Sequence, residues 1–108
     1  MKLGIILQSN NPEHIWNTLR LGITALKTGH SVQISLMSEG VEIEDIHDTE
    51  QFDISKKLQE FKDLKGFVAA CETCLKIRLK SESKVCPVTT MSDLVKMIEE
   101  SDKVLVFG

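Results

Sequence analysis

Three cysteines are the side chains of this sequence with the greatest capacity for covalent chemistry. Cys71 and Cys74 form a C-x-x-C pair in the segment FVAACETCLKIRLK, and Cys86 follows beside Pro87. A thiolate is a nucleophile and a metal ligand, and it can carry a second sulfur atom as a persulfide. Cys71 ends an apolar run and precedes a helix-like segment, so free amides at the start of that helix would favour its thiolate. We therefore predict that Cys71 is the reactive residue.

The other two cysteines allow less specific predictions. Cys74 lies one helical turn beyond Cys71, where it can either act as a resolving thiol or simply pack. Cys86 precedes a proline in an irregular segment, which favours a structural role. A four-ligand zinc site would need Cys86 and a histidine, but no second C-x-x-C or H-x-x-x-H pattern accompanies the pair. We predict neither a bound metal nor a cofactor.

The cysteine pair belongs to a chain that alternates strand-like runs with helix-like segments. Apolar runs predict five strands, at Lys2–Leu7, Val32–Met37, Phe67–Ala70, Lys84–Val88 and Lys103–Phe107. Helical spacing of apolar residues predicts four helices, at Glu13–Thr28, Asp53–Lys65, Cys71–Lys80 and Thr90–Ser101. Strands joined by such helices must run mostly parallel, with helices on both faces of the sheet. We predict one α/β domain over residues 1–108, a three-layer α/β/α fold around a five-stranded, mostly parallel sheet.

The predicted sheet brings several polar segments to one edge, because reactive groups of a parallel α/β sheet collect beyond the carboxyl ends of its strands. Asn10 and Asn11 follow the first strand, Glu39 and Gly40 follow the second, and Cys71 directly follows the third. We predict that these residues share a pocket. Strand orders 2-1-3-4-5 and 4-3-2-1-5 both fit the sequence. The acidic segment 38–52 has no clear periodicity, which predicts a loop with about one helical turn.

Composition excludes several classes of partner. A net charge of −3 gives no general attraction to phosphates, and one Trp, four Phe and no Tyr leave few platforms for stacked bases. We therefore predict no nucleic-acid partner. No apolar run approaches the roughly 20 residues that a transmembrane helix needs, and the N-terminus lacks a signal-peptide core. These features predict a cytoplasmic protein without a membrane partner, whose cysteines remain thiols.

The order of short motifs along the chain resembles that of the DsrE/DsrF-like family, which includes sulfur-relay proteins. The motifs are S-E-G-V after the second strand, A-C-E-T-C after the third, and S-D-K-V-L-V-F at the terminal strand. The resemblance implies a DsrEFH-like, largely parallel five-stranded sheet and a homo-oligomer, either a trimer or a hexamer. In sulfur-relay members a cysteine after the third strand carries a persulfide, and that position matches Cys71. Cys74 matches a second cysteine that is found in some small relatives and not in the relay proteins.

Three functions remain open from the sequence. The first is a sulfur carrier, similar to a sulfurtransferase, that takes sulfur onto Cys71 from a donor protein and delivers it to an acceptor protein. The second is a dithiol redox protein that uses Cys71 and Cys74, although the aromatic-Cys-Gly-Pro-Cys context of thioredoxin-type motifs is missing. The third is an oligomeric binding module in which the cysteines only pack.

Overall fold

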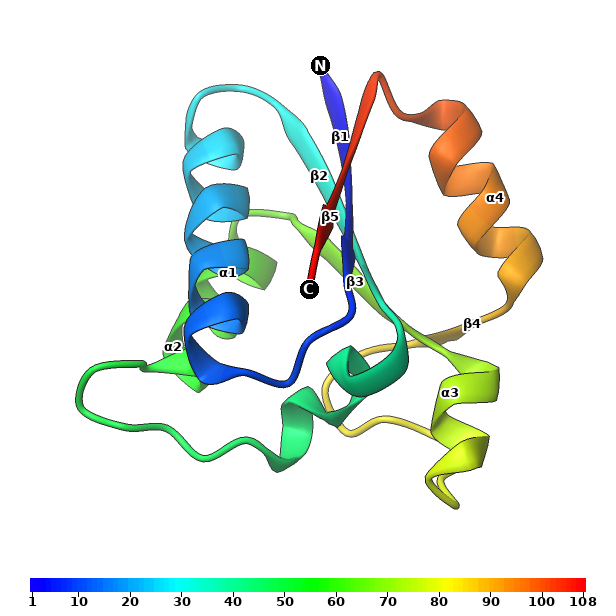
Figure 1. Cartoon of the computed structure of the whole chain (residues 1–108). Coiled ribbons are helices and arrows are strands. Elements are labelled where there is room, and N and C mark those ends of the chain that lie inside the picture. Colours follow the sequence, from blue (N-terminus) through cyan, green and yellow to red (C-terminus); the bar gives the residue numbers. More distant parts are fainter.

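Five strands form one all-parallel sheet in the order β4-β3-β2-β1-β5, in a computed structural model that describes residues 1–108 (Figure 1). The strands are β1 (Lys2–Leu7), β2 (Ser31–Leu36), β3 (Phe67–Cys71), β4 (Val88–Thr89) and β5 (Lys103–Phe107). The predicted five-stranded α/β fold is confirmed, and of the two strand orders that fit the sequence the structure has 4-3-2-1-5. This order places β4 beside β3, so that Thr89 pairs with Cys71.

Helices cover both faces of the sheet. The helical segments are α1 (Pro12–Lys27), the 3₁₀ helix η1 (Ser38–Asp45), α2 (Ile54–Asp63), α3 (Glu72–Ile77) and α4 (Met91–Glu100). In Figure 1, α1 and α2 lie on one side of the sheet and α4 on the other, while η1 and α3 lie near the carboxyl ends of the strands. None of these helices combines the length and the apolar character that a membrane span requires.

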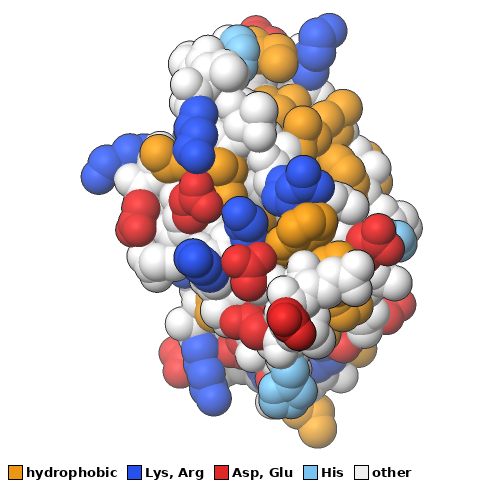
Figure 2. Space-filling view, turned by 90° about the vertical axis from the view of Figure 1, so that its left-hand side faces the viewer, with side chains coloured by type: hydrophobic (Ala, Val, Ile, Leu, Met, Phe, Trp, Pro, Cys, Tyr) orange, Lys and Arg blue, Asp and Glu red, His pale blue; other side chains and the backbone are white.

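The hydrophobic core lies mainly between the sheet and the layer formed by α1 and α2. Alternate residues of neighbouring strands stack there in register, as in the buried pairs Ile5–Ile34 and Leu7–Leu36. Phe61 of α2 is fully buried in this layer. Figure 2 views the molecule from the side of α1 and α2, where acidic and basic side chains are interspersed and form no continuous field of one sign.

The segment between β3 and α4 differs from its predicted form in two respects. The helix predicted to reach Lys80 ends at Ile77, because Leu79 takes a left-handed conformation (φ 59°). The amides of Leu79 and Lys80 then donate to the carbonyls of Lys76 and Leu75, which is the Schellman pattern that ends helices. Leu79 consequently points to solvent with 96% of its surface exposed, although its spacing from Leu75 predicted a shared helix face.

The fourth strand and the acidic segment also differ from prediction. Lys84–Val88 was expected as a strand, but β4 comprises only Val88 and Thr89. Pro87 lacks an amide hydrogen and contributes only its carbonyl, which accepts from the amide of Ala70. The acidic segment expected as a loop with one helical turn contains η1 over eight residues. Both segments lie at the carboxyl edge of the sheet, close to Cys71.

Candidate functional site

Cys71 is the last residue of β3 and the N-cap residue of α3, as its position in the sequence predicted. Its side chain is 9% exposed and lines two adjoining hollows of about 10 and 90 Å³ on the α4 side of the sheet. The walls of the two hollows come from β2, α3, β4 and α4, and comprise Ser35, Leu36, Met37, Glu72, Thr73, Thr89, Thr90, Met91 and Leu94. The sulfur of Cys71 is therefore buried but lies next to a small opening at the surface.

The structure does not supply the predicted contact between Cys71 and the start of the following helix. The Cys71 side chain makes no capping hydrogen bond, and α3 has only six residues. The backbone of Cys71 is extended (φ −65°, ψ 124°), which ends the strand and begins the helix without involving the sulfur. The predicted reactivity of Cys71 therefore has no support from hydrogen bonds with α3.

Cys74 is the cysteine whose sulfur accepts a hydrogen bond from a backbone amide. The backbone N–H of Ser38, the first residue of η1, donates to Cys74 Sγ at 3.2 Å. Burial raises the pKa of the Cys74 thiol; the Ser38 amide opposes this shift, and the neighbouring Cys71 thiol adds to it. The Cys71 thiol thus lies close enough to Cys74 to affect the ionisation of Cys74. Ser38 itself has a φ of 50°, so a strained turn at the end of β2 brings this amide over the cysteine pair.

Cys86 lies apart from the cysteine pair and is partly buried against the hydrophobic core. Its sulfur donates to Ser83 Oγ at 3.6 Å, and burial raises the pKa of its thiol. Cys86 is also absent from the walls of both hollows. All three cysteines are free thiols, and no group of three or more His, Cys, Asp and Glu side chains is placed to hold a metal ion.

None of the four residues predicted to share the pocket of Cys71 lines its hollows. These residues are Asn10, Asn11, Glu39 and Gly40. Asn10 donates to Glu42 Oε1 at 3.2 Å, and the side chain of Asn11 caps α1 by accepting from the amides of Glu13 and His14. Glu39 is exposed to solvent, on the first turn of η1.

Gly40 is buried with its backbone against that of Leu7, so that a Cβ atom at this position would collide with the Leu7 carbonyl oxygen. The prediction placed these four residues correctly at the carboxyl edge of the sheet. Their contacts, however, are with α1, η1 and β1, and their proposed role around Cys71 has no support from these contacts.

The residues that do line the hollows were not predicted, because the fourth strand was expected at Lys84–Val88 and β4 instead comprises Val88 and Thr89. Thr89 pairs with Cys71 across the sheet, and Thr90 and Met91 follow it at the start of α4. The one sequence signal was the capping-box spacing of Thr90 and Asp93, which the structure confirms. That signal places a helix start there but cannot show which strand lies beside it.

The basic side chains that follow Cys71 pair with acidic ones and are not directed at its sulfur. Arg78 Nε lies 2.6 Å from Glu42 Oε2, and Lys80 Nζ lies 2.8 Å from Glu44 Oε1 and 2.7 Å from Asp45 Oδ2. These pairs join η1 to the segment after α3 and hold Ser38 over Cys74. The acidic segment expected as a loop therefore forms part of the support of the site.

Glu44 is the acid on which this connection depends most, because only 5% of its side chain is exposed. It also accepts from the backbone amide of Lys84 at 2.9 Å. We expect Glu44→Gln to lower the free energy of unfolding at pH 7 by about 1.5–3 kcal/mol, since hydrogen bonds to charged groups contribute that much. Urea denaturation of the wild type and the variant measures the difference.

The same difference should depend on pH. The hydrogen bond from Lys80 holds the pKa of Glu44 below its ordinary value, with the Lys84 amide acting in the same direction. The stabilisation is therefore fully present above the ordinary pKa of a glutamate, about 4.3, and is lost as the pH falls through the lower pKa of the folded state. Asp45→Asn is the matched control: its carboxylate is 59% exposed, so a loss below about 1 kcal/mol is expected. Equal losses in the two variants, or a difference that persists in acid, would contradict this assignment.

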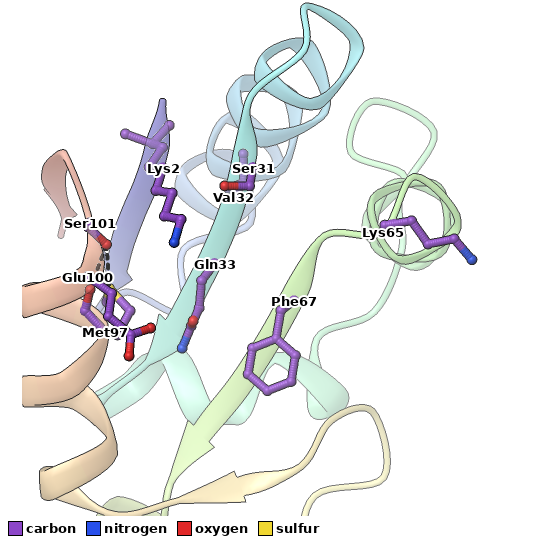
Figure 3. Close-up of a pocket in the computed structure, with 10 residues that line it drawn as sticks. Lys2, Ser31, Val32, Gln33, Lys65, Phe67, Met97, Glu100 and Ser101 are labelled. Atoms are coloured by element: carbon purple, nitrogen blue, oxygen red, sulfur yellow. Dashed lines mark hydrogen bonds between the residues drawn. The ribbon is translucent and has the colours of Figure 1, made fainter.

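A further hollow, of about 220 Å³, lies at the opposite edge of the sheet, between α4 and the amino ends of β1, β2 and β3. Figure 3 shows Lys2, Gln33, Phe67 and Glu100 around it. It contains no cysteine and none of the residues predicted for the site. The chemistry that a thiol can perform is therefore confined to the carboxyl edge.

The fold and the site together define a parallel α/β domain with a cysteine at the end of its third strand. The chain belongs to the DsrE/DsrF-like family, whose model matches residues 1–107. The family resemblance predicted from the sequence is thereby confirmed.

Two relatives from archaea are similar over most of the chain. The uncharacterized protein MJ0989 of Methanocaldococcus jannaschii is 32% identical over 99% of this chain and 100% of its own length. The uncharacterized protein MK0008 of Methanopyrus kandleri is 32% identical over 88% of this chain and 83% of its own length. The names of both relatives leave their activity open, so they support the family and not a specific function.

Two solved structures share the fold. The YchN protein from Escherichia coli superposes with a TM-score of 0.82 and 24% sequence identity, covering 99% of this chain and 100% of its own. The conserved protein of unknown function BT1422 from Bacteroides thetaiotaomicron has a TM-score of 0.76 and 16% identity, covering 97% and 93%. At these identities the likeness establishes the architecture alone.

Proposed function

We propose that this protein is a sulfur carrier that holds a persulfide on Cys71 and passes the outer sulfur atom to an acceptor thiol. The observation that carries the proposal is the position of Cys71 at the carboxyl edge of the sheet, against two hollows that lead to the surface. Membership of a family that includes sulfur-relay proteins supports it further. Because the thiols must stay reduced between transfers, we place this exchange in the cytoplasm.

The transfer consists of two displacements at sulfur. The Cys71 thiolate attacks the outer sulfur of a donor persulfide, and the donor leaves as a thiolate. An acceptor thiolate then attacks the outer sulfur on Cys71, which regenerates the Cys71 thiolate. Neither step changes the total oxidation state, so no cofactor is required. The low exposure of Cys71 limits access by water, while the larger hollow, with the hydroxyls of Thr73, Thr89 and Thr90 in its wall, gives room for the added sulfur atom.

Sulfur loading tests the proposal directly. We expect the wild-type protein to gain one sulfur atom after anaerobic incubation with a small-molecule persulfide, and Cys71→Ser to gain none, as measured by intact-protein mass spectrometry. Cys86→Ser is the matched control, because Cys86 lies outside the hollows, and it should load like the wild type. A wild type that takes up no sulfur, or a Cys71→Ser variant that takes up as much, would favour a binding module in which the cysteines only pack.

We further propose that the protein assembles into a homo-oligomer through α4. Met91, Val95 and Ile98 are 53%, 49% and 43% exposed and lie on one side of this helix at helical spacing. We call these three residues the α4 stripe. A stripe of this kind normally contacts another surface. Met91 also lines both hollows beside Cys71, so a second copy bound at the stripe would border the site.

A further inference from the structure

We propose that Cys74 discharges the persulfide on Cys71 as free sulfide. In this step the Cys74 sulfur attacks the inner sulfur of the Cys71 persulfide, a Cys71–Cys74 disulfide forms, and hydrosulfide leaves. The inference rests on the proposed sulfur loading of Cys71 and adds a second outcome to it: the sulfur either passes to an acceptor thiol or is released within the protein.

The geometry of the cysteine pair carries this inference. Cys71 is the N-cap residue of α3 and Cys74 is the third residue of that helix, so the two side chains emerge one turn apart on the same side. Cys74 packs against the core cluster that contains Cys71. The Ser38 amide, 3.2 Å from Cys74 Sγ, holds the second sulfur in place and partly offsets the rise in its pKa that burial causes.

The support of the Ser38 amide comes from outside α3. The Met37 amide bonds to the Leu7 carbonyl at 3.0 Å, and the Gly40 amide bonds to the Met37 carbonyl at 2.8 Å. These bonds anchor the start of η1 to the end of β1. The ion pairs of Glu42 and Glu44 with the segment after α3 anchor the rest of η1. The attacking thiol is thus positioned by η1, an element held by contacts at both of its ends.

The step balances without an outside oxidant. One persulfide and one thiol become one disulfide and one hydrogen sulfide, so the outer sulfur is reduced to sulfide, the Cys74 sulfur is oxidised, and the Cys71 sulfur keeps its oxidation state. The bond between the inner and outer sulfurs breaks as the bond between the two cysteine sulfurs forms, and the proton of the Cys74 thiol is released with the sulfide. A second turnover requires a dithiol reductant to reopen the disulfide.

A single-turnover experiment tests the inference. The full chain is loaded anaerobically with a small-molecule persulfide, freed from excess donor, and sampled over time by alkylation and intact-mass analysis, while released sulfide is trapped and measured. For the wild type we expect the added sulfur to disappear, the protein to end two hydrogens lighter than its reduced form, and one sulfide to appear per chain. Cys86→Ser should behave in the same way.

Cys74→Ser separates this inference from the proposed function. We expect it to load sulfur as the wild type does but to keep the persulfide at least about tenfold longer, because attack from within the protein is far faster than attack by a dilute thiol in solution. Equal sulfide release from Cys74→Ser would overturn the role of Cys74 and leave sulfur loading intact. Absence of loading in both the wild type and Cys74→Ser would overturn both proposals.

Discussion

Phe61→Ala is expected to lower the free energy of unfolding by about 3–5 kcal/mol, the range measured when a buried phenylalanine is truncated and leaves a cavity. The Phe61 ring has no exposed surface and lies between two glycines. A Cβ atom at Gly22 of α1 would come within 2.8 Å of this ring, and one at Gly66 within 2.5 Å. The ring therefore fills the space that the two glycines leave between α1, α2 and the start of β3.

Urea denaturation followed by circular dichroism measures this loss, and Phe67→Ala is the matched control. Phe67 belongs to β3 but is 44% exposed, so the same truncation there removes much less buried surface and should cost roughly 1 kcal/mol or less. Similar losses in the two variants would show that Phe61 is not the residue that joins the α1–α2 layer to the sheet.

Val95→Glu is expected to convert the assembled protein into a monomer of 12.1 kDa. Val95 lies at the centre of the α4 stripe, so a second copy that covers the stripe would bury the new carboxylate without a partner. Burial of an unpaired charge costs several kcal/mol, enough to dissociate an ordinary interface. The fold of each copy should be unaffected, because Val95 is half exposed in the single chain.

Size-exclusion chromatography with light scattering gives the mass in solution. Ser92→Glu adds the same charge to the same helix outside the α4 stripe, at an exposed position, and should leave the assembly intact. A monomeric wild type would contradict the proposed homo-oligomer. An assembly that persists in Val95→Glu would show that the interface lies on another surface, such as the one around the exposed Val106 of β5.

The fold was predictable because its elements are encoded locally. The apolar runs of β1 and β3, the capping box of Thr90 and the alternation of strands with helices need no knowledge of distant contacts. The end of α3 was not predictable in the same way. Leu79 adopts a left-handed conformation that is usually found at glycine, and the next residue, Lys80, forms ion pairs with η1 that the local sequence does not show.

The site was predictable only in part, for a related reason. The placement of Cys71 after the third strand follows from the chain order, and the structure confirms it. Both strand orders that fit the sequence put the fourth strand beside the third, but that strand was expected to end at Val88, whereas the residue that pairs with Cys71 is Thr89. Thr89 and Met91 were therefore missed. The amide donor expected from α3 instead comes from Ser38 and reaches Cys74, a contact across 36 residues of sequence.

The two borders of the sheet are unlike, and this difference limits how many copies can join through their backbones. β4 has two residues and follows Pro87, so it offers an incoming strand almost no unpaired backbone groups. β5 at the other border has five residues with exposed Leu105 and Val106. Fibre growth by strand addition needs two receptive borders on every molecule. Because β4 is too short to accept a strand, only β5 can pair, and such pairing stops after two molecules. The short β4 therefore protects the protein against open-ended polymerisation.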